Sequence, residues 1–219
     1  MDDRMTRRQE IGAERRERTR QRLLAASARV VAELGEKKAS IDDFIRAAGV
    51  ARGTFYNHYS TREQLIDDLW ASIGQAPFHQ IQKACESLDD PAARLATEAR
   101  LVFASATQNE AWGWLVYSMS ADNDTVSEDL LSYPRPDLEI GRKQGRFQFD
   151  DLSAACDLVV GSVRWGLRAV LEEGRPLRCG DSLCVLLLKA LSIGDAEARE
   201  IVARPLPELP VLSPATDPA

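Results

Sequence analysis

The segment from Ser40 to Tyr59 constrains the fold most, because it fits two short helices joined by a very short turn. Its first half carries apolar residues at the i, i+3, i+4 and i+7 spacing of one helix face: Ile41, Phe44, Ile45 and Ala48. Ser40 is a good N-cap with Asp43 three residues later, and Gly49 stands where a helix C-terminus needs a left-handed residue. Two such helices, braced by an apolar helix before them, form a helix-turn-helix.

Helical periodicity recurs along the rest of the chain, whereas the alternation typical of strands is hard to find. A capping box at 60–63 starts a fourth helix that continues through Ile73. A broken region at 126–146 contains Pro134 and Pro136. We expect further helices at 15–34, 40–48, 52–59, 91–107, 110–118, 151–173, 181–193 and 195–203. The sequence therefore predicts an all-α chain with an N-terminal three-helix head and a larger helical body.

The predicted helix at 52–59 has an unusual outer face. If Phe55 and Tyr59, one turn apart, point to the core, the other side chains turn outward at 100° per residue. These outward residues are Arg52, Gly53, Thr54, Tyr56, Asn57 and His58. None is acidic, and all but the glycine can donate hydrogen bonds to phosphates or base edges. A merely solvated helix would normally carry Glu and Lys here, so we interpret this face as a nucleic-acid reader.

At these residues the chain resembles the TetR family of bacterial transcriptional repressors. The resemblance spans about 16–70, through Ala48-Gly49-Val50, Gly53-Thr54, Phe55-Tyr56, His58-Tyr59 and the capped Arg62-Glu63-Gln64-Leu65. It implies a fold with a DNA-binding head and a ligand-binding, dimeric body. The remaining two thirds of the chain match only in being helical.

The resemblance also implies roles for single residues in binding double-stranded DNA. Asn57 would read a base edge, since asparagine can bind adenine bidentately, and three neighbours would face the major groove with it: Arg52, Gly53 and Thr54. Tyr56 and His58 would hold phosphates, Arg62 would grip the backbone beside a helix N-terminus, and Ser40 would add a phosphate contact. Ile45 and Ala51 depart from the family pattern, which has a small residue and a hydroxyl residue there.

Charge is split along the chain, which carries −6 in total. Residues 4–62 hold 14 basic and 7 acidic side chains, whereas residues 71–219 hold 14 basic and 22 acidic ones. A basic head on an acidic body fits a head that binds a polyanion, although a solvated helix face is the common reason for a charge run. We expect a flexible basic arm at 1–14, a DNA-binding domain at 15–66, an effector-binding and dimerisation domain at 67–204, and a Pro-rich tail at 205–219.

Two stretches of the body lack a polar face. Residues 154–171 are apolar or small nearly all round, and residues 183–188 form an unbroken apolar run. Such helices must be covered on both sides, either inside one chain or by a second copy. We expect a homodimer, and the resemblance implies the same two-fold assembly through the last two long helices.

Aromatic residues in the body raise the possibility of an effector site. We expect an unknown small, hydrophobic or aromatic ligand to contact Phe103, Trp112, Trp114, Tyr117, Trp165 and Arg168. Aromatic residues at helical spacing are also common in plain protein cores, so both readings stay open.

Several other classes of protein are poorly supported. The two histidines, His58 and His79, fit no metal or catalytic motif, so we expect no enzyme activity, no metal and no cofactor. No apolar run approaches membrane-spanning length, no signal peptide is visible, and the four cysteines are scattered, which favours a cytoplasmic protein without a membrane partner. The leading hypothesis is a ligand-released repressor of a near-palindromic operator. The alternative is a DNA-bound interaction protein that recruits a protein partner through its body, without a small effector.

Overall fold

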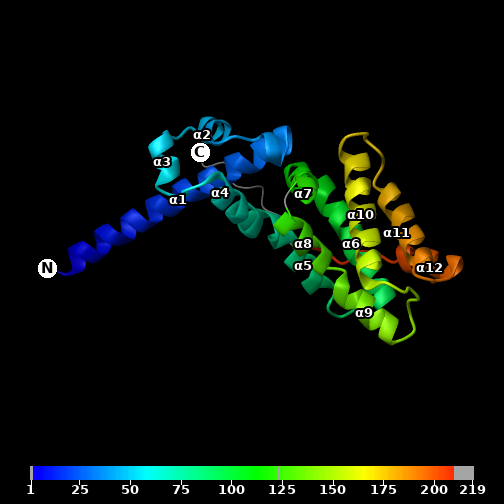
Figure 1. The fold of residues 1–219 in the computed structure, drawn as a ribbon. Helices are drawn as coiled ribbons and strands as arrows, with labels where there is room; N and C mark the ends of the chain where they lie inside the picture. The colour runs from blue at the N-terminus through cyan, green and yellow to red at the C-terminus, as the bar shows by residue number, and fades with distance from the viewer. Residues whose placement is uncertain (1, 123, 210–219) are drawn as a thin grey trace.

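The computed structural model describes residues 2–122 and 124–209, and this part of the chain contains helices and connections but no strand. The head consists of α1 (Asp2–Leu34), α2 (Ile41–Ala48), α3 (Arg52–Tyr56) and α4 (Arg62–Leu69). The body consists of α5 (Ala76–Cys85), α6 (Pro91–Gln108), α7 (Glu110–Asp122), α8 (Asp124–Ser132), α9 (Arg135–Lys143), α10 (Leu152–Leu171), α11 (Arg178–Ala190) and α12 (Asp195–Ala203). In Figure 1 the head and the body lie side by side along one elongated molecule, with α3 on the outer side of the head. The all-α fold with a head and a larger body is confirmed.

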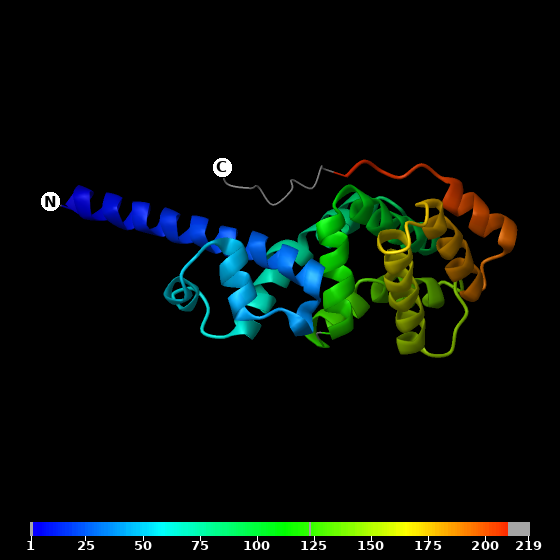
Figure 2. The ribbon, with the colours of Figure 1, turned by 90° about the horizontal axis from the view of Figure 1, so that it is seen from above.

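The first helix is longer than the sequence predicts. It begins at Asp2 instead of Arg15, and its N-terminal turns extend away from the rest of the protein (Figures 1 and 2). Arg, Glu, Gln and Ala favour helix strongly, so propensity continues the helix beyond the apolar stripe that packs on the head. A separate arm at 1–14 is therefore not seen as a break in α1, and its flexibility stays a prediction.

Other differences concern the ends of helices. The third helix ends at Tyr56, three residues early, and α5 was not predicted. The region at 126–146 contains two helices, α8 and α9, and the second has a proline in its first turn. Prolines are tolerated there because those N–H groups have no partner within the helix. The tail at 205–209 is not helical, and the predicted tail at 210–219 lies outside the described residues.

Head and body share one continuous apolar core. Phe44, Phe55 and Leu65 are fully buried in the head, and the same cluster continues into the body through Trp70 and Phe78. Helix α7 packs against α1 and closes this core from the body side. A second cluster lies among α6, α9, α10, α11 and α12. The helices of the head and those of the body are thus packed in one core.

Candidate functional site

Local sequence fixes α2 at both ends. The Ser40 hydroxyl accepts a hydrogen bond from the Asp43 backbone N–H at 3.3 Å, and the Asp43 carboxylate accepts one from the Ser40 N–H at 3.1 Å. This capping box lowers the pKa of Asp43, first through the Ser40 hydroxyl and then through the Ser40 N–H. Gly49 ends the helix in the left-handed conformation, at φ 61°. Both features are as the sequence predicts, and they set the sharp turn into α3.

Helix α3 turns the predicted face outward. Phe55 is fully buried and Tyr59, just beyond the helix, is 5 % exposed. Tyr56 is 49 % exposed, and Arg52, Gly53 and Asn57 are also exposed, while Thr54 and His58 are partly buried. A Cβ added at Gly53 would meet no atom within 4 Å, so this position is open to an approaching partner. The geometry derived from 100° per residue is confirmed.

Two contacts hold this face in place. The Arg16 guanidinium of α1 donates to the Asn57 carbonyl oxygen at 3.1 Å. The Asn57 side-chain amide makes no hydrogen bond with any residue in 2–122 or 124–209, so it is available to a partner. Arg52 forms an ion pair of 3.1 Å with Asp42 of α2, and both side chains are 59 % exposed. Burial, and then the nearby Arg16 charge, lower the pKa of His58.

A polar network fastens α1, α3 and α4 together behind this face. The Tyr59 hydroxyl donates to the Asp68 carboxylate at 2.6 Å, and Arg20 donates to both oxygens of that carboxylate at 2.8 and 2.6 Å. Burial opposes ionisation of Asp68, but these donors and the Ser72 hydroxyl together lower its pKa. Burial and the Asp68 contact raise the pKa of Tyr59. The network fixes the angle at which α3 is presented.

Arg62, which the sequence predicts to contact a phosphate, is bonded within the head. Its Nε donates to the Ala39 carbonyl oxygen at 2.9 Å, and its Nη2 donates to the backbone carbonyl and the carboxylate of Glu36. Glu36 is only 5 % exposed, so an unpaired carboxylate there would be costly. The guanidinium therefore ties α4 to the connection between α1 and α2, and its contact with a phosphate stays a prediction.

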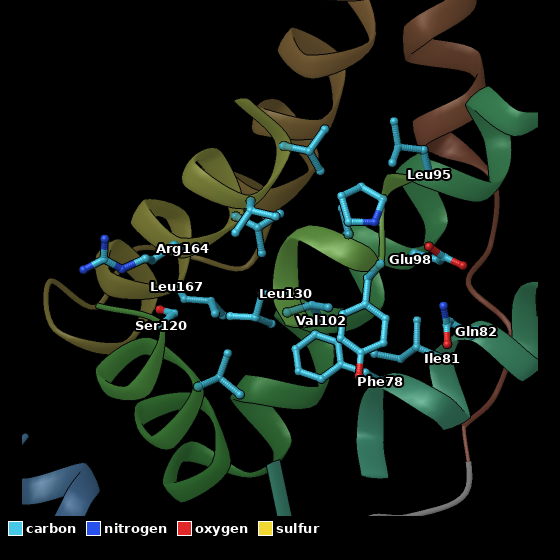
Figure 3. A pocket seen from close by; sticks show the side chains of 17 residues that line it. Phe78, Ile81, Gln82, Leu95, Glu98, Val102, Ser120, Leu130, Arg164 and Leu167 are labelled. Carbon is cyan, nitrogen blue, oxygen red and sulfur yellow. The ribbon is translucent and has the colours of Figure 1, made fainter. Parts of the chain in front are cut away.

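The body contains a cavity of about 80 Å³ among α5, α6, α7, α8 and α10 (Figure 3). Its lining is dominated by aliphatic side chains and one phenyl ring: Phe78, Ile81, Leu95, Val102, Val116, Leu130, Val159, Val160, Val163 and Leu167. A few polar residues complete it: Gln82, Glu98, Ser120, Tyr133 and Arg164. A mostly apolar hollow with few polar groups is typical of a small-molecule site.

The polar groups of the cavity differ in how they lie. Figure 3 shows the ends of the Glu98 and Gln82 side chains toward one another on one side, while the Arg164 guanidinium points away on the opposite side. The Arg164 guanidinium lies over the rings of Tyr117 and Trp165, at 5.4 and 5.8 Å. Burial, and then the nearby Asp137 carboxylate, raise the pKa of Glu98 to about 8.

The cavity is joined to the head through aromatic rings and hydrogen bonds. Phe78 stacks on Tyr133, at 4.7 Å between ring centroids, and also contacts Trp70 and Trp112. Trp70 lies directly after the end of α4, and its indole N–H donates to the Asp129 carboxylate of α8 at 2.8 Å. A five-residue π-helical turn, Trp70–Gly74, connects α4 to α5 at this point. Such turns are frequent at functional sites.

Comparison with protein families decides the identity of the chain. Residues 23–69 match the model of bacterial regulatory proteins of the tetR family, and residues 90–204, more than half of the chain, match the tetracyclin repressor-like C-terminal domain. The chain belongs to the TetR family. It is a helix-turn-helix transcriptional regulator, as the resemblance of its head implies.

Solved structures share the fold over most of the chain. RolR in complex with resorcinol is 29 % identical, with a TM-score of 0.69, and the match covers 90 % of this chain and 100 % of that one. RolR without ligand gives 28 % identity, a TM-score of 0.67 and coverage of 86 % and 99 %. FadR from Bacillus subtilis, in complex with stearoyl-CoA, is 17 % identical with a TM-score of 0.65 over 77 % and 97 %, which concerns the fold alone.

A curated relative has a higher sequence identity, but over a short stretch. YvdT, an uncharacterized HTH-type transcriptional regulator of Bacillus subtilis (strain 168), is 44 % identical over 46 residues. The match spans 21 % of this chain and 24 % of that relative, so it concerns only a part the size of the head.

None of the six predicted ligand residues of this TetR protein lines the cavity. Phe103 is buried in a space that Gly166 and Gly180 leave open to its ring, and the Trp112 indole N–H donates to the Gly74 carbonyl at 3.0 Å in the core. Trp114 meets Tyr117 edge to face at 5.9 Å. Trp165 is 57 % exposed on the outside of α10, and Arg168 forms an ion pair with Glu172. These large rings therefore lie in the packed core or on the surface, and the cavity is lined mainly by smaller, branched side chains.

The residues that do line the cavity are less conspicuous in the sequence. Val159, Val160, Val163 and Leu167 belong to the stretch at 154–171 that is apolar nearly all round. Glu98 stands alone as an acid in the apolar part of α6, between Arg94 and Arg100. An acid in such a helix is a candidate functional group, and this cue was missed.

The outer face of α10 and α11 is apolar and exposed. Four large side chains on or beside these helices are 40 to 60 % exposed: Leu158, Trp165, Leu177 and Leu186. A shallow hollow between the helices is lined by Gly161, Gly166 and Leu183. In Figure 1 these helices lie on the side of the TetR body that faces away from the head.

Within the described residues, no helix has both the length and the apolar character to cross a membrane, and no group of three or more acidic, His or Cys residues is arranged to hold a metal.

Proposed function

We propose that this TetR-family regulator is a homodimeric repressor that a small ligand releases from a near-palindromic operator. The outward face of α3 is the observation that carries the proposal. Its exposed side chains include hydrogen-bond donors and no acid, and the Asn57 amide is free to bind a base edge. In this proposal Tyr56 and His58 hold phosphates, Arg52, Gly53 and Thr54 face the major groove, and Ser40 lies near the backbone through the N-terminus of α2.

The exposed apolar face of α10 and α11 supports the dimer. Leu186 and Trp165 are 60 and 57 % exposed, which is unusual for large apolar side chains that have no partner. A second copy of the same face would cover them. Two heads related by a two-fold axis then place their α3 helices in successive major grooves, about 34–36 Å apart.

The cavity supports release by a ligand. It is close to the junction of head and body, because its lining residue Phe78 contacts Trp70 at the end of α4. A ligand that fits one dimer shape better than the other shifts the spacing of the heads. The match to RolR, which was solved with resorcinol, supports a small aromatic ligand. The proposed site is the cavity lining, in place of the six residues predicted from the sequence. No part of this proposal requires an enzyme activity.

Selection of bound duplexes from a random pool tests the DNA and dimer parts together. We expect two inverted half-sites whose centres are 10–10.5 base pairs or a multiple apart. The association constant should fall steeply as salt rises, with a slope of several units in log K against log salt, because α1 to α4 carry many basic residues. A single asymmetric site bound by one protomer would contradict the dimer, and binding independent of salt would contradict the reader. A partner protein that co-purifies, with no ligand that alters DNA affinity, would favour recruitment instead.

A further inference from the structure

One acidic group in the cavity has no partner. The Glu98 carboxylate forms no hydrogen bond or ion pair with any residue in the described ranges 2–122 and 124–209. Arg94, one turn earlier on α6, is the cation that acts on Glu98, but its guanidinium is bonded to Asp137 of α9 and to the Leu88 carbonyl oxygen. Asp137 is therefore compensated and Glu98 is not. Glu98 is only partly exposed, and a half-buried acid without a partner calls for an explanation.

The surroundings of Glu98 favour its uncharged form. Burial and the Asp137 carboxylate raise its pKa to about 8, while Arg94 acts weakly in the opposite direction. A protonated carboxyl group donates one hydrogen bond and accepts others. A ligand hydroxyl does the same, so the two groups complement each other without placing a charge in an apolar hollow.

The shape and lining of the cavity limit the rest of the ligand. About 80 Å³ corresponds to roughly five to eight times the least space that holds one water molecule. The walls beside Glu98 are aliphatic or aromatic. They include Leu95 on α6, the helix that carries Glu98, and Ile81 on α5, the helix that carries Gln82. The Arg164 guanidinium points away from the other lining side chains (Figure 3) and lies over the rings of Tyr117 and Trp165, while its buried Nε has no hydrogen-bond partner among the described residues. A single aromatic ring fits this space better than a long acyl chain.

We propose that Glu98 is the specificity-determining residue of the cavity, and that it binds the hydroxyl group of a small aromatic ligand, with the Gln82 amide beside it. This inference rests on the proposed function, in which the cavity is the effector site. It goes further by naming the chemical class of the effector and the residue that selects it. A site built to bond a hydroxyl rejects an analogue without one far more strongly than a merely apolar pocket does.

Direct binding to the full-length protein tests the inference, with resorcinol and m-xylene as a matched pair of probes. Methyl groups replace the two hydroxyls at similar size. We expect isothermal titration to give at least tenfold tighter binding of resorcinol to the wild type. In Glu98→Leu this preference should disappear, and in Glu98→Gln part of it should remain, since the amide still bonds a hydroxyl. Glu128→Leu, an exposed acid on the neighbouring helix α8, is the control and should keep the full preference.

Several results would overturn the inference. These are equal binding of the two probes to the wild type, an unchanged preference in Glu98→Leu, or no binding of either probe. Tighter binding of benzylamine, lost in Glu98→Gln, would assign Glu98 to a cation instead. Circular dichroism checks that each variant is folded. Release of operator DNA is measured separately on the same samples, so resorcinol binding without release would contradict the proposed function and leave the assignment of Glu98 intact.

Discussion

The head and the body of this protein hold their functions in different ways. In the head, single side chains at fixed positions form the surface: Asn57 and Arg52 face outward because Phe55 and Tyr59 are buried on the opposite side. In the body, the candidate site is a space left between five helices, and most of its lining residues are ordinary aliphatic ones. A surface that reads DNA thus depends on the identity of single residues, whereas an effector cavity depends on how helices pack. Mutations should therefore separate the two regions.

The largest effect is expected from the polar network behind α3. Asp68→Ala leaves the Arg20 guanidinium and the Tyr59 hydroxyl without their shared acceptor in a partly buried place. Loss of one partner of such a pair typically costs about 3 kcal/mol of stability. Urea unfolding followed by circular dichroism measures it. Asp67→Ala, the exposed neighbour, is the matched control and should change stability by less than about 0.5 kcal/mol.

A loss as small as the control's would mean that the network does not stabilise the head. If the head unfolds in Asp68→Ala while the body stays folded, the two regions are energetically separate despite their shared core.

The second prediction concerns a substitution that should change DNA specificity but leave the stability of the fold unchanged. Asn57→Ala removes an exposed amide whose side chain has no bond to the described part of the chain, so the fold should be unaffected. Discrimination between the selected operator and random DNA should fall by about 1–3 kcal/mol, or roughly 5- to 150-fold. Fluorescence anisotropy with both duplexes measures it. Gln144→Ala, an exposed amide on the body, should leave discrimination unchanged. An equal loss on both duplexes would make Asn57 a general contact instead of a base reader.

The third prediction concerns the body and its dependence on pH. The pKa of Glu98 is about 8 in the folded protein, above the ordinary 4.5, so the folded state binds more protons between these values. Stability should therefore fall as pH rises from about 4.5 to 8. The fall is at most about 1.4 kcal/mol per pH unit, and partial exposure of Glu98 should leave a total of about 1–2 kcal/mol. Glu98→Gln should remove this part of the fall, as measured by urea unfolding at several pH values.

The comparison with Glu98→Gln isolates one group among several. Asp137 also has a raised pKa, through burial, and it remains in both proteins, so its contribution cancels in the difference. Glu128→Gln, exposed on α8, should follow the wild-type curve. If Glu98→Gln followed the wild-type curve as well, the Glu98 carboxyl would be well solvated, and its role in the cavity would be in doubt.

The same contrast explains what the sequence could predict. The capping box at Ser40, the left-handed Gly49 and the outward face of α3 follow from local rules, and the structure confirms them. The contacts of Arg62 with Glu36 and Ala39 were not predicted, because these partners come from a connection more than twenty residues away, which local patterns do not reveal.

The cavity could not be located for a related reason. Large rings such as Trp112 and Phe103 were expected to line it, but large rings fill space, and the hollow lies where branched side chains of five helices leave a gap. The shape of such a gap depends on helix crossings that no short motif encodes. Only the isolated acid Glu98 in an apolar helix gave a local cue.

The smallest effect is expected where the head carries a charge that opposes its own function. Asp42 of α2 holds the Arg52 guanidinium at 3.1 Å and brings a negative charge to the surface proposed to meet DNA. An exposed pair of this kind contributes little to stability, on the order of 0.5 kcal/mol. Asp42→Asn should therefore leave the fold intact and release Arg52 toward a phosphate. We expect two- to threefold tighter operator binding at low salt, and a smaller gain at high salt, because screening weakens both contacts. Anisotropy titrations at two salt concentrations measure the change, with Asp67→Asn as the control for the loss of one negative charge.

Weaker binding in Asp42→Asn would mean that Asp42 positions Arg52 for the major groove. The acid would then belong to the DNA-binding surface instead of competing with DNA for Arg52.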